Sequence, residues 1–403
     1  MLGKYGQEKK YLSSIIFVMI LVGYPIFSGI TIVLGIESNS LSIAYRLIVL
    51  VATSVLLLTS LFRYRLRINY RILIGASFLL SYAIRMFLEW AVNSDGSKLD
   101  WDEFWSFLIL VCLVPALPYV WKKNLPNESF TPVAIIVFGI IGLVLNFYLI
   151  FHAGNLSLGD QLISGRLENE RLNSIAYGHL GVSTALVSLW AILLKKEINI
   201  LTVLGLFIGI LGVVASGSRG PFLSLAVCAV LILLQLKFRA TKFSVIFAAI
   251  FVAVFLIFGL FIDFDNIYIL NRVETSMFED DSRSRIFGDA YHAFLDNIFL
   301  GAGYPFDAYP HNIVLEAFMS SGIFSGALMV ATLAIGVIAS VKVLKDKNFS
   351  WVSLLFMQYL LFSMVSSSIY YSNILWMLWA CIVTLSVNIY LIEGEKNAGI
   401  HIE

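Results

Sequence analysis

Long apolar stretches alternate with short polar segments along almost the whole chain. Twelve apolar stretches have the roughly 20 residues that a helix needs to cross a bilayer, so the pattern predicts an all-α, polytopic membrane protein. No soluble domain interrupts them, and residues 1–403 are expected to form a single integral membrane domain. The expected membrane helices cover residues 12–35, 41–62, 72–92, 103–121, 132–151, 174–194, 198–216, 221–238, 243–262, 322–341, 350–370 and 374–392.

Lysine and arginine are distributed asymmetrically between the connecting loops. Of the 27 basic residues, 18 lie at every second boundary between apolar stretches, seven lie in the alternate loops, and Arg46 and Arg85 lie within spans. Because loops rich in Lys and Arg stay in the cytoplasm, this alternation predicts that both termini are cytoplasmic. The two large loops, residues 152–173 and 263–310, are then expected on the outer side of the membrane.

Composition supports this class and excludes others. The chain is 59% hydrophobic and only 13% charged, which is too apolar for a soluble domain of 403 residues. A net charge of +1 gives no basic surface for nucleic acid. Cys112, Cys228 and Cys381 lie in apolar stretches without paired spacing, so they are expected to form neither disulfides nor metal sites.

The outer loops are enriched in arginine, which the topology rule does not explain. Six of their seven basic residues are arginine, whereas most cytoplasmic basic residues are lysine. A guanidinium fork suits phosphate or carboxylate recognition better than an ammonium group does. The functional interpretation is an anionic ligand on the outer side, and the alternative is chance in a small sample.

The second large loop contains an amphipathic segment. Its residues recur at roughly helical spacing, which predicts a helix lying along the membrane surface. The segment 301–310, GAGYPFDAYP, then ends this helix with two glycines and two prolines. The recurring positions are Arg285, Ile286, Phe287, Ala290, Phe294, Leu295 and Ile298.

His311 opens a second short helix, HNIVLEAFMSSGIFSG, on the same side. An imidazole can accept a proton near neutral pH, and Asn312 and Glu316 share a helical face because they are four residues apart. Gly322 and Gly326 would let this helix pack closely against the next span. The alternative is a histidine at a helix terminus that takes no part in chemistry.

Arg219 lies in SGSRGPFL, between two apolar stretches and on the same outer side. Pro221 suits the first turn of the following helix, and Ser218 is placed to cap it. An anion here would meet helix-start amides as well as a guanidinium. The alternative is an interfacial anchor that snorkels toward water.

The remaining candidates carry weaker signals. Arg283 and Arg285 follow an acidic run, 279–281, but that run contains no histidine, so no metal and no cofactor are expected. Arg166 and Arg171 are five residues apart, and only the fold can bring them together. Tyr304 can stack on a sugar, although Trp and Tyr are usual at membrane interfaces.

Three strings in this order resemble motifs of the O-antigen polymerase and O-antigen ligase superfamily: SGSRGPFL, RSRIFGDAYHAFLDNIFLGAGY and PHNIVLEAFMSSGIFSG. The resemblance in motifs covers about the second half of the chain, and the resemblance in the order of apolar segments and loops covers the whole chain. It implies a GT-C-like glycosyltransferase of the bacterial inner membrane, with its active site on the periplasmic face. The implied donor is a glycan on undecaprenyl pyrophosphate.

The resemblance also implies roles for individual residues. Arg219 and Arg285 are expected to bind the pyrophosphate, with Arg283 as second choice to Arg285, and His311 is expected to be the base. Arginines can stabilise a leaving pyrophosphate without a metal. Further substrate contacts are expected at Arg166, Arg171, Asn312, Glu316 and Tyr304.

Within the superfamily the polymerase branch is favoured. A polymerase adds the growing glycan to the non-reducing end of a lipid-linked repeat unit, whereas a ligase transfers it to lipid A–core. The compact loop 263–310 and Gly220 in SGSRG look more polymerase-like. The expected partners are the lipid-linked oligosaccharide, membrane lipids, a chain-length regulator and a flippase.

A transporter of polysaccharide or lipid-linked oligosaccharide is the alternative of another class. Transporters usually show internal repeats and ionisable groups at mid-membrane. No repeat is visible here, and the clear intramembrane charges are Arg46, Arg85 and Glu89. Arg85 and Glu89 are four residues apart and are expected to pair.

Overall fold

The computed structural model describes residues 2–34, 38–64, 69–93, 100–154, 173–237, 282–304 and 310–397, and every regular element within these ranges is helical. In the first half of the chain these elements are α1 Leu2–Val18, η1 Met19–Gly23, α2 Tyr24–Val33, α3 Ser38–Arg63, α4 Tyr70–Asn93, α5 Trp101–Trp105, η2 Ser106–Leu113, α6 Val114–Ala116, η3 Leu117–Val120, η4 Lys122–Asn124 and α7 Phe130–Gly154. In the second half they are α9 Ser174–Trp190, η5 Ala191–Lys195, α10 Ile200–Ala215, α11 Arg219–Lys237, α14 Ser282–Asp296, α15 Ile313–Val343, α16 Ser350–Val365, η7 Ile369–Tyr371 and α17 Asn373–Asn397.

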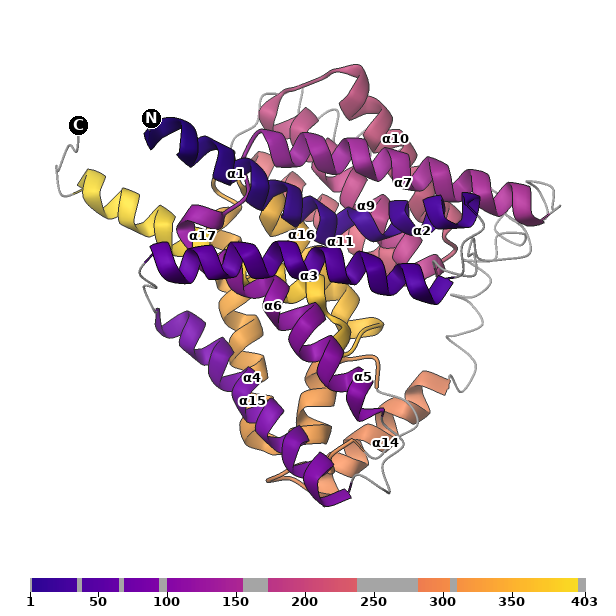
Figure 1. Cartoon of the computed structure of the whole chain (residues 1–403), viewed down its shortest axis with the longest axis vertical. Coiled ribbons are helices and arrows are strands. Elements are labelled where there is room, and N and C mark those ends of the chain that lie inside the picture. The colour runs from indigo at the N-terminus through magenta and orange to yellow at the C-terminus, as the bar shows by residue number, and fades with distance from the viewer. Residues whose placement is uncertain are drawn as a thin grey trace.

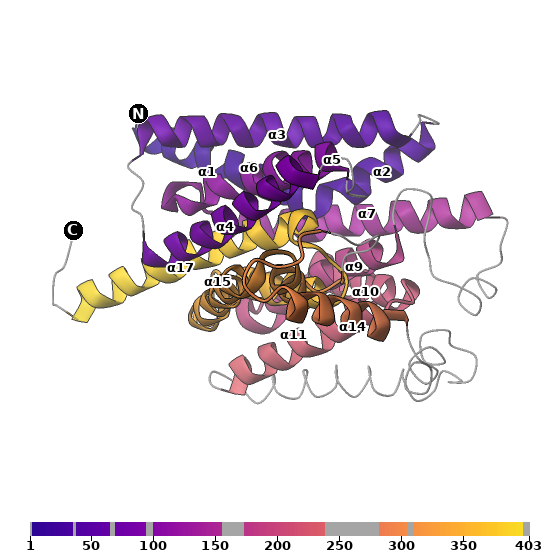
Figure 2. The same cartoon turned by 90° about the horizontal axis from the view of Figure 1, so that it is seen from below.

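The helices confirm a polytopic membrane protein. Eleven of the twelve predicted spans fall on helical segments, and the twelfth, residues 243–262, lies outside the described residues. Within the ranges that the structure describes, seven segments are long and apolar enough to cross a membrane, and α10, α11, α16 and α17 contribute shorter apolar helices. α1 begins and α17 ends at one end of the bundle, while α7 ends at the other (Figures 1 and 2).

Two predicted boundaries are corrected. α7 continues to Gly154, into the first predicted loop. α16 ends at Val365 rather than at residue 370, and the chain then passes through three consecutive serines, 366–368. Serine side chains bond to nearby backbone and so compete with a helix; here Ser367 Oγ and Ser372 Oγ are hydrogen-bonded at 2.9 Å.

α9 is the central helix of the bundle. It packs against α7, α10, α11 and α16, and every residue from 177 to 194 is buried within the protein. Its contact with α10 depends on small residues, because a Cβ on Gly181 would lie 2.7 Å from Gly209 O, and one on Gly209 would lie 2.7 Å from Ala185 N. Such close backbone contact is how membrane helices gain packing energy where the hydrophobic effect is absent.

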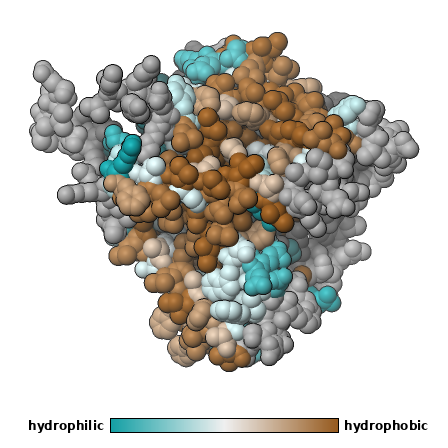
Figure 3. All heavy atoms as spheres, in the orientation of Figure 1, coloured by the Kyte–Doolittle hydropathy of each residue, from teal (hydrophilic) through white to brown (hydrophobic). Residues whose placement is uncertain are grey.

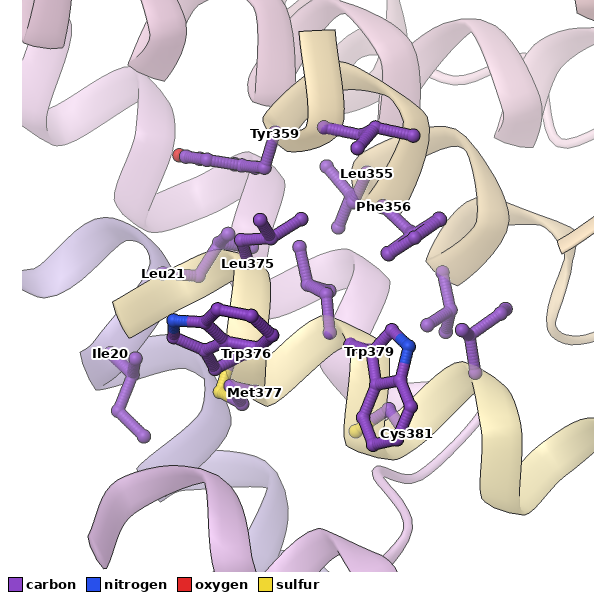
Figure 4. Close-up of a cluster of buried hydrophobic side chains, with 14 of the residues drawn as sticks. Ile20, Leu21, Leu355, Phe356, Tyr359, Leu375, Trp376, Met377, Trp379 and Cys381 are labelled. Carbon is purple, nitrogen blue, oxygen red and sulfur yellow. The ribbon is translucent and has the colours of Figure 1, made fainter. Parts of the chain in front are cut away.

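α16, α17 and η1 form a second buried region. Trp376, Met377, Trp379 and Cys381 of α17 pack beside Leu355 and Phe356 of α16 (Figure 4). The indole groups are satisfied, since Trp376 Nε1 donates to Ile369 O and Trp379 Nε1 donates to Thr332 O. Outside this core, apolar side chains cover much of the surface, and a paler, more polar patch lies in the lower part of the face shown in Figure 3. A lipid-facing surface explains the exposed apolar area.

α15 is broken at Gly322, which has φ of 75° and ψ of −175°. A Cβ on Gly326 would lie 2.3 Å from Phe318 Cδ1, although two residues eight apart on a straight helix are separated by about 12 Å. The chain therefore turns sharply at Gly322. This confirms the predicted short helix after His311 and its close contact with the next span.

The segment 297–304 fills the break in α15. Met319 O and Ser320 O lose their helical donors at Gly322, and they instead accept from Ala302 N at 2.7 Å and Gly303 N at 3.2 Å. In return, Ile323 N donates to Ile298 O at 2.8 Å. The exchange leaves these backbone groups satisfied where water is scarce.

The predicted pair of Arg85 and Glu89 is confirmed, with Nη1 and Oε2 2.8 Å apart. Arg85 also donates from Nε to Leu300 O at 2.8 Å and from Nη2 to Gly301 O at 3.2 Å. The pair therefore fastens the segment 297–304 to α4, which explains two charges within a span.

Gly322→Ala is expected to destabilise the protein. Its positive φ disfavours any side chain, and a Cβ would lie 2.2 Å from Phe299 O. Thermal unfolding of the detergent-purified protein should show a lower midpoint, which corresponds to a loss of more than about 1 kcal/mol in the free energy of unfolding. Gly288→Ala is the matched control, because Gly288 is helical with nothing within 4 Å of its Cβ position; its midpoint should stay or rise. Equal midpoints for both variants would show that the break does not require glycine.

Candidate active site

Arg219 is positioned by the tight turn that joins α10 to α11. Gly217 has φ of 58°, and Ser216 Oγ donates to Val213 O at 2.7 Å while accepting from Ser218 N at 3.3 Å. Arg219 is the first residue of α11 and is half-buried. The turn thus places a guanidinium beside helix-start amides, which lack acceptors in the preceding turn.

His311 and Asn312 form the start of α15. His311 is half-buried and has φ of 55°, a left-handed conformation that is uncommon for residues other than glycine. Asn312 Oδ1 accepts from Val314 N and Leu315 N, both at 3.0 Å. Asn312 is therefore the N-cap that fixes where the helix begins.

The end of α16 brings these two segments together. Asn312 Nδ2 donates to Met364 O at 3.0 Å. On the α11 side, a Cβ on Gly220 would lie 3.6 Å from Val365 Cγ2. His311 thus immediately precedes a residue that contacts Met364, and Arg219 immediately precedes a residue next to Val365. Met364 and Val365 are consecutive residues at the end of α16. The predicted arginine and histidine motifs meet in space although they are 92 positions apart in the chain.

Glu316 lies behind this helix start and is fully buried. Its Oε1 accepts from Ser368 Oγ at 2.8 Å, Tyr82 Oη at 3.2 Å and Tyr304 Oη at 3.3 Å, and its Oε2 accepts from Ile369 N at 3.0 Å. These donors belong to α4, to the segment 297–304 and to the start of η7 with its N-cap Ser368, called the η7 region below. The carboxylate therefore cross-links three parts of the fold.

Tyr304 belongs to the same buried network, with only 3% of its surface exposed. Burial and the nearby Glu316 raise the pKa of Tyr304 well above its ordinary value, so its hydroxyl stays protonated and donates. The contacts of Glu316 and Tyr304 are thus to the protein itself. Their predicted contact with substrate stays a prediction.

Arg285 lies on α14, the helix that was predicted to follow the membrane surface. The side chains of α14 fall on three faces. The face toward the bundle includes the buried Ala290 and the half-buried Phe294, whose ring is 5.3 Å from that of Phe318. An exposed apolar face is formed by Phe287, Tyr291 and Leu295, and the exposed Ile298 follows the end of the helix. An exposed polar face is formed by Arg285, Asp289, His292 and Asp296.

Three faces of this kind suit a helix at the boundary between protein, lipid and water. Arg285 is on the polar face and makes no hydrogen bond or ion pair with the residues that the structure describes. Its guanidinium is therefore exposed on the polar face of α14.

The remaining predicted residues are placed as follows. Arg283 is on the first turn of α14, whereas Arg166, Arg171 and the acidic run 279–281 lie outside the described residues. Within the described ranges, no group of three or more His, Cys, Asp or Glu residues is suited to a metal.

His179 is not among the predicted site residues, yet it lies beside Gly220, the residue that follows Arg219. It is buried in α9, and its Nε2 is 4.0 Å from the Cβ position of Gly220. The available signal was its place as the one histidine in the apolar stretch 174–194. A single imidazole changes the hydropathy of such a stretch very little.

Comparison with known proteins bears on the same region. Residues 204–330 match the family model described as O-antigen ligase. This match contains Arg219, Arg285 and His311. A search of curated proteins finds no significant match.

Glu316→Ala is expected to destabilise the protein strongly, since removing one partner of a buried polar network leaves several groups unsatisfied. The loss in unfolding free energy should be about 3 kcal/mol or more, against about 1 kcal/mol for Tyr82→Phe. Chemical unfolding followed by tryptophan fluorescence would measure both.

Glu103→Ala is the matched control, because Glu103 is exposed and its side chain accepts one hydrogen bond from the described residues, from Tyr371 Oη. Its stability should change little. A stable Glu316→Ala protein that has lost substrate binding would instead support the predicted substrate contact.

Proposed function

Since residues 204–330 form a domain of the O-antigen ligase and polymerase family, we propose that this membrane enzyme is a surface-polysaccharide polymerase. It transfers a growing glycan from undecaprenyl pyrophosphate to the non-reducing end of a lipid-linked repeat unit. The observation that carries the proposal is the convergence of the Arg219 turn and the His311 helix start at the end of α16.

In the proposed reaction, Arg219 and the first turn of α11 bind the pyrophosphate, and Arg285 or Arg283 approaches it from the membrane surface. These donors stabilise the negative charge that grows on the leaving group. His311 accepts the proton from the attacking sugar hydroxyl. The bond between the anomeric carbon and the phosphate oxygen breaks, a glycosidic bond forms, and undecaprenyl pyrophosphate leaves.

The proposal places this site on the periplasmic face of the inner membrane. One support is the alternation of basic loops along the sequence. A second is that the start of α1 and the end of α17 lie at the same end of the bundle (Figure 1). A lipid-linked pyrophosphate is already activated, so the reaction needs no nucleotide sugar on that side. The GT-C-like architecture stays a prediction.

O-antigen ligase is the second candidate, because the matching family model carries that description. The two activities differ only in the acceptor. The compact second loop and Gly220 favour the polymerase.

Purified protein supplied with lipid-linked repeat units should produce a ladder of longer glycans on a gel. Arg219→Ala and Arg285→Ala should each reduce the rate by about 100-fold or more. His311→Asn should do the same, and asparagine is chosen because it tolerates the left-handed backbone. Full activity in His311→Asn would remove the base assignment.

Arg63→Ala is the matched control for lost positive charge, because Arg63 is exposed at the end of α3, on the predicted cytoplasmic side. It should leave the ladder unchanged. If the purified protein transfers glycan only when lipid A–core is added as the acceptor, it is a ligase rather than a polymerase.

Chelator treatment tests the predicted independence from metal. Polymerisation by the purified enzyme should continue at an unchanged rate in excess EDTA, because the arginines supply the positive charge. A loss of activity that magnesium or manganese restores would indicate a metal site, with 279–281 as the first segment to mutate.

A further inference from the structure

His179 is buried in the bundle, on the helix α9. Its ring lies 4.4 Å from that of Phe362 and 5.9 Å from that of Tyr359. Only 2% of the residue is exposed. The ring is thus packed against two aromatic side chains.

Neither ring nitrogen of His179 has a hydrogen-bond partner among the described residues. Buried polar groups are nearly always paired, because leaving one unpaired forfeits its hydration without compensation. The side chain of the nearby Gln358 is engaged elsewhere. Its Nε2 donates to the backbone carbonyl of His179 at 2.9 Å, and its Oε1 accepts from Ser183 Oγ at 3.2 Å. The imidazole therefore lacks an internal structural partner.

The edge of the ring that carries Nε2 faces the first turn of α11. Nε2 is the His179 atom found 4.0 Å from the Cβ position of Gly220. The neighbouring residue, Gly178, fixes this contact, since its own Cβ position lies 2.6 Å from Pro221 Cγ. A third donor therefore points at the helix start that already presents Arg219 and the early amides of α11.

We propose that His179 is a further ligand for the diphosphate, with Nε2–H donating to a phosphate oxygen bound at the first turn of α11. A neutral imidazole carries one proton, and an anion at a helix N-terminus beside an arginine requires donors. Gly220 has no side chain to separate the ring from that anion. The inference rests on the proposed function and adds a binding residue to the same site.

Two substitutions separate this role from packing. His179→Leu fills the apolar pocket but removes the donor, whereas His179→Gln keeps an amide donor at a similar reach. If His179 binds the diphosphate, the leucine variant should unfold at or above the wild-type midpoint, because a buried unpaired polar group has been removed. A packing role would instead lower that midpoint.

The experiment is titration calorimetry of the full-length protein in phosphatidylglycerol-containing nanodiscs, with undecaprenyl pyrophosphate as the probe. His179→Leu should raise the Kd by about 10- to 100-fold, the effect of one hydrogen bond to a charged group, and His179→Gln should raise it much less. Tyr359→Phe is the control from the wall of the same pocket and should bind as wild type does.

Wild-type affinity in His179→Leu, with binding lost in Arg219→Ala, would overturn the inference and leave the proposed function standing. A lowered unfolding midpoint in both His179 variants would overturn it in favour of packing. Failure of the wild-type protein itself to bind the probe would overturn the proposed function, and this inference with it.

Discussion

The carboxylate of Glu316 is the interaction on which the geometry of this region depends. Four donors from three separate segments converge on it in a fully buried position. A buried carboxylate is tolerated only while its hydrogen bonds persist. The segments that supply them, α4, 297–304 and the η7 region, must therefore stay together, and the helix start four residues before Glu316 stays with them.

The site has one rigid part and one peripheral part. Arg219, His179 and the His311 helix start belong to the bundle, where close glycine contacts between α9 and α10 leave little freedom. Arg285 belongs to α14, which joins the bundle through one face only, by contacts such as Phe294 with Phe318. A lipid-linked substrate would meet both parts, its diphosphate at the bundle and its lipid alongside the exposed apolar surface.

Hydropathy was sufficient to place eleven of the twelve predicted apolar segments on helices, seven of them long enough to cross a membrane among the described residues, because a bilayer imposes a minimum apolar length on every crossing helix. Local sequence also predicted the helix start at Arg219, the amphipathic helix around Arg285, and a helix opening at His311 that in the structure begins two residues later, at Ile313. The sharp turn at Gly322 was only partly predictable, since a glycine is equally compatible with close packing and with a left-handed backbone.

Tertiary contacts decided what local sequence could not. Asn312 and Glu316 share a helical face, yet Asn312 caps the helix while Glu316 is enclosed by residues 82, 304, 368 and 369. Those partners are distant in the chain, and no local pattern links them. The same reason explains why His179 could not be recognised from its apolar surroundings, because its significance comes from Gly220, 41 positions later.

The three faces of α14 also restrict its rotation. If the helix rolled about its axis, Phe287 and Tyr291 would enter water or Arg285 would enter lipid, and either change is unfavourable. In the proposed arrangement, the position of the membrane surface thus sets the direction of the Arg285 side chain, together with the protein contacts of α14. A bilayer of different thickness shifts that surface relative to the bundle, so in this arrangement lipid composition becomes a determinant of where Arg285 meets the substrate.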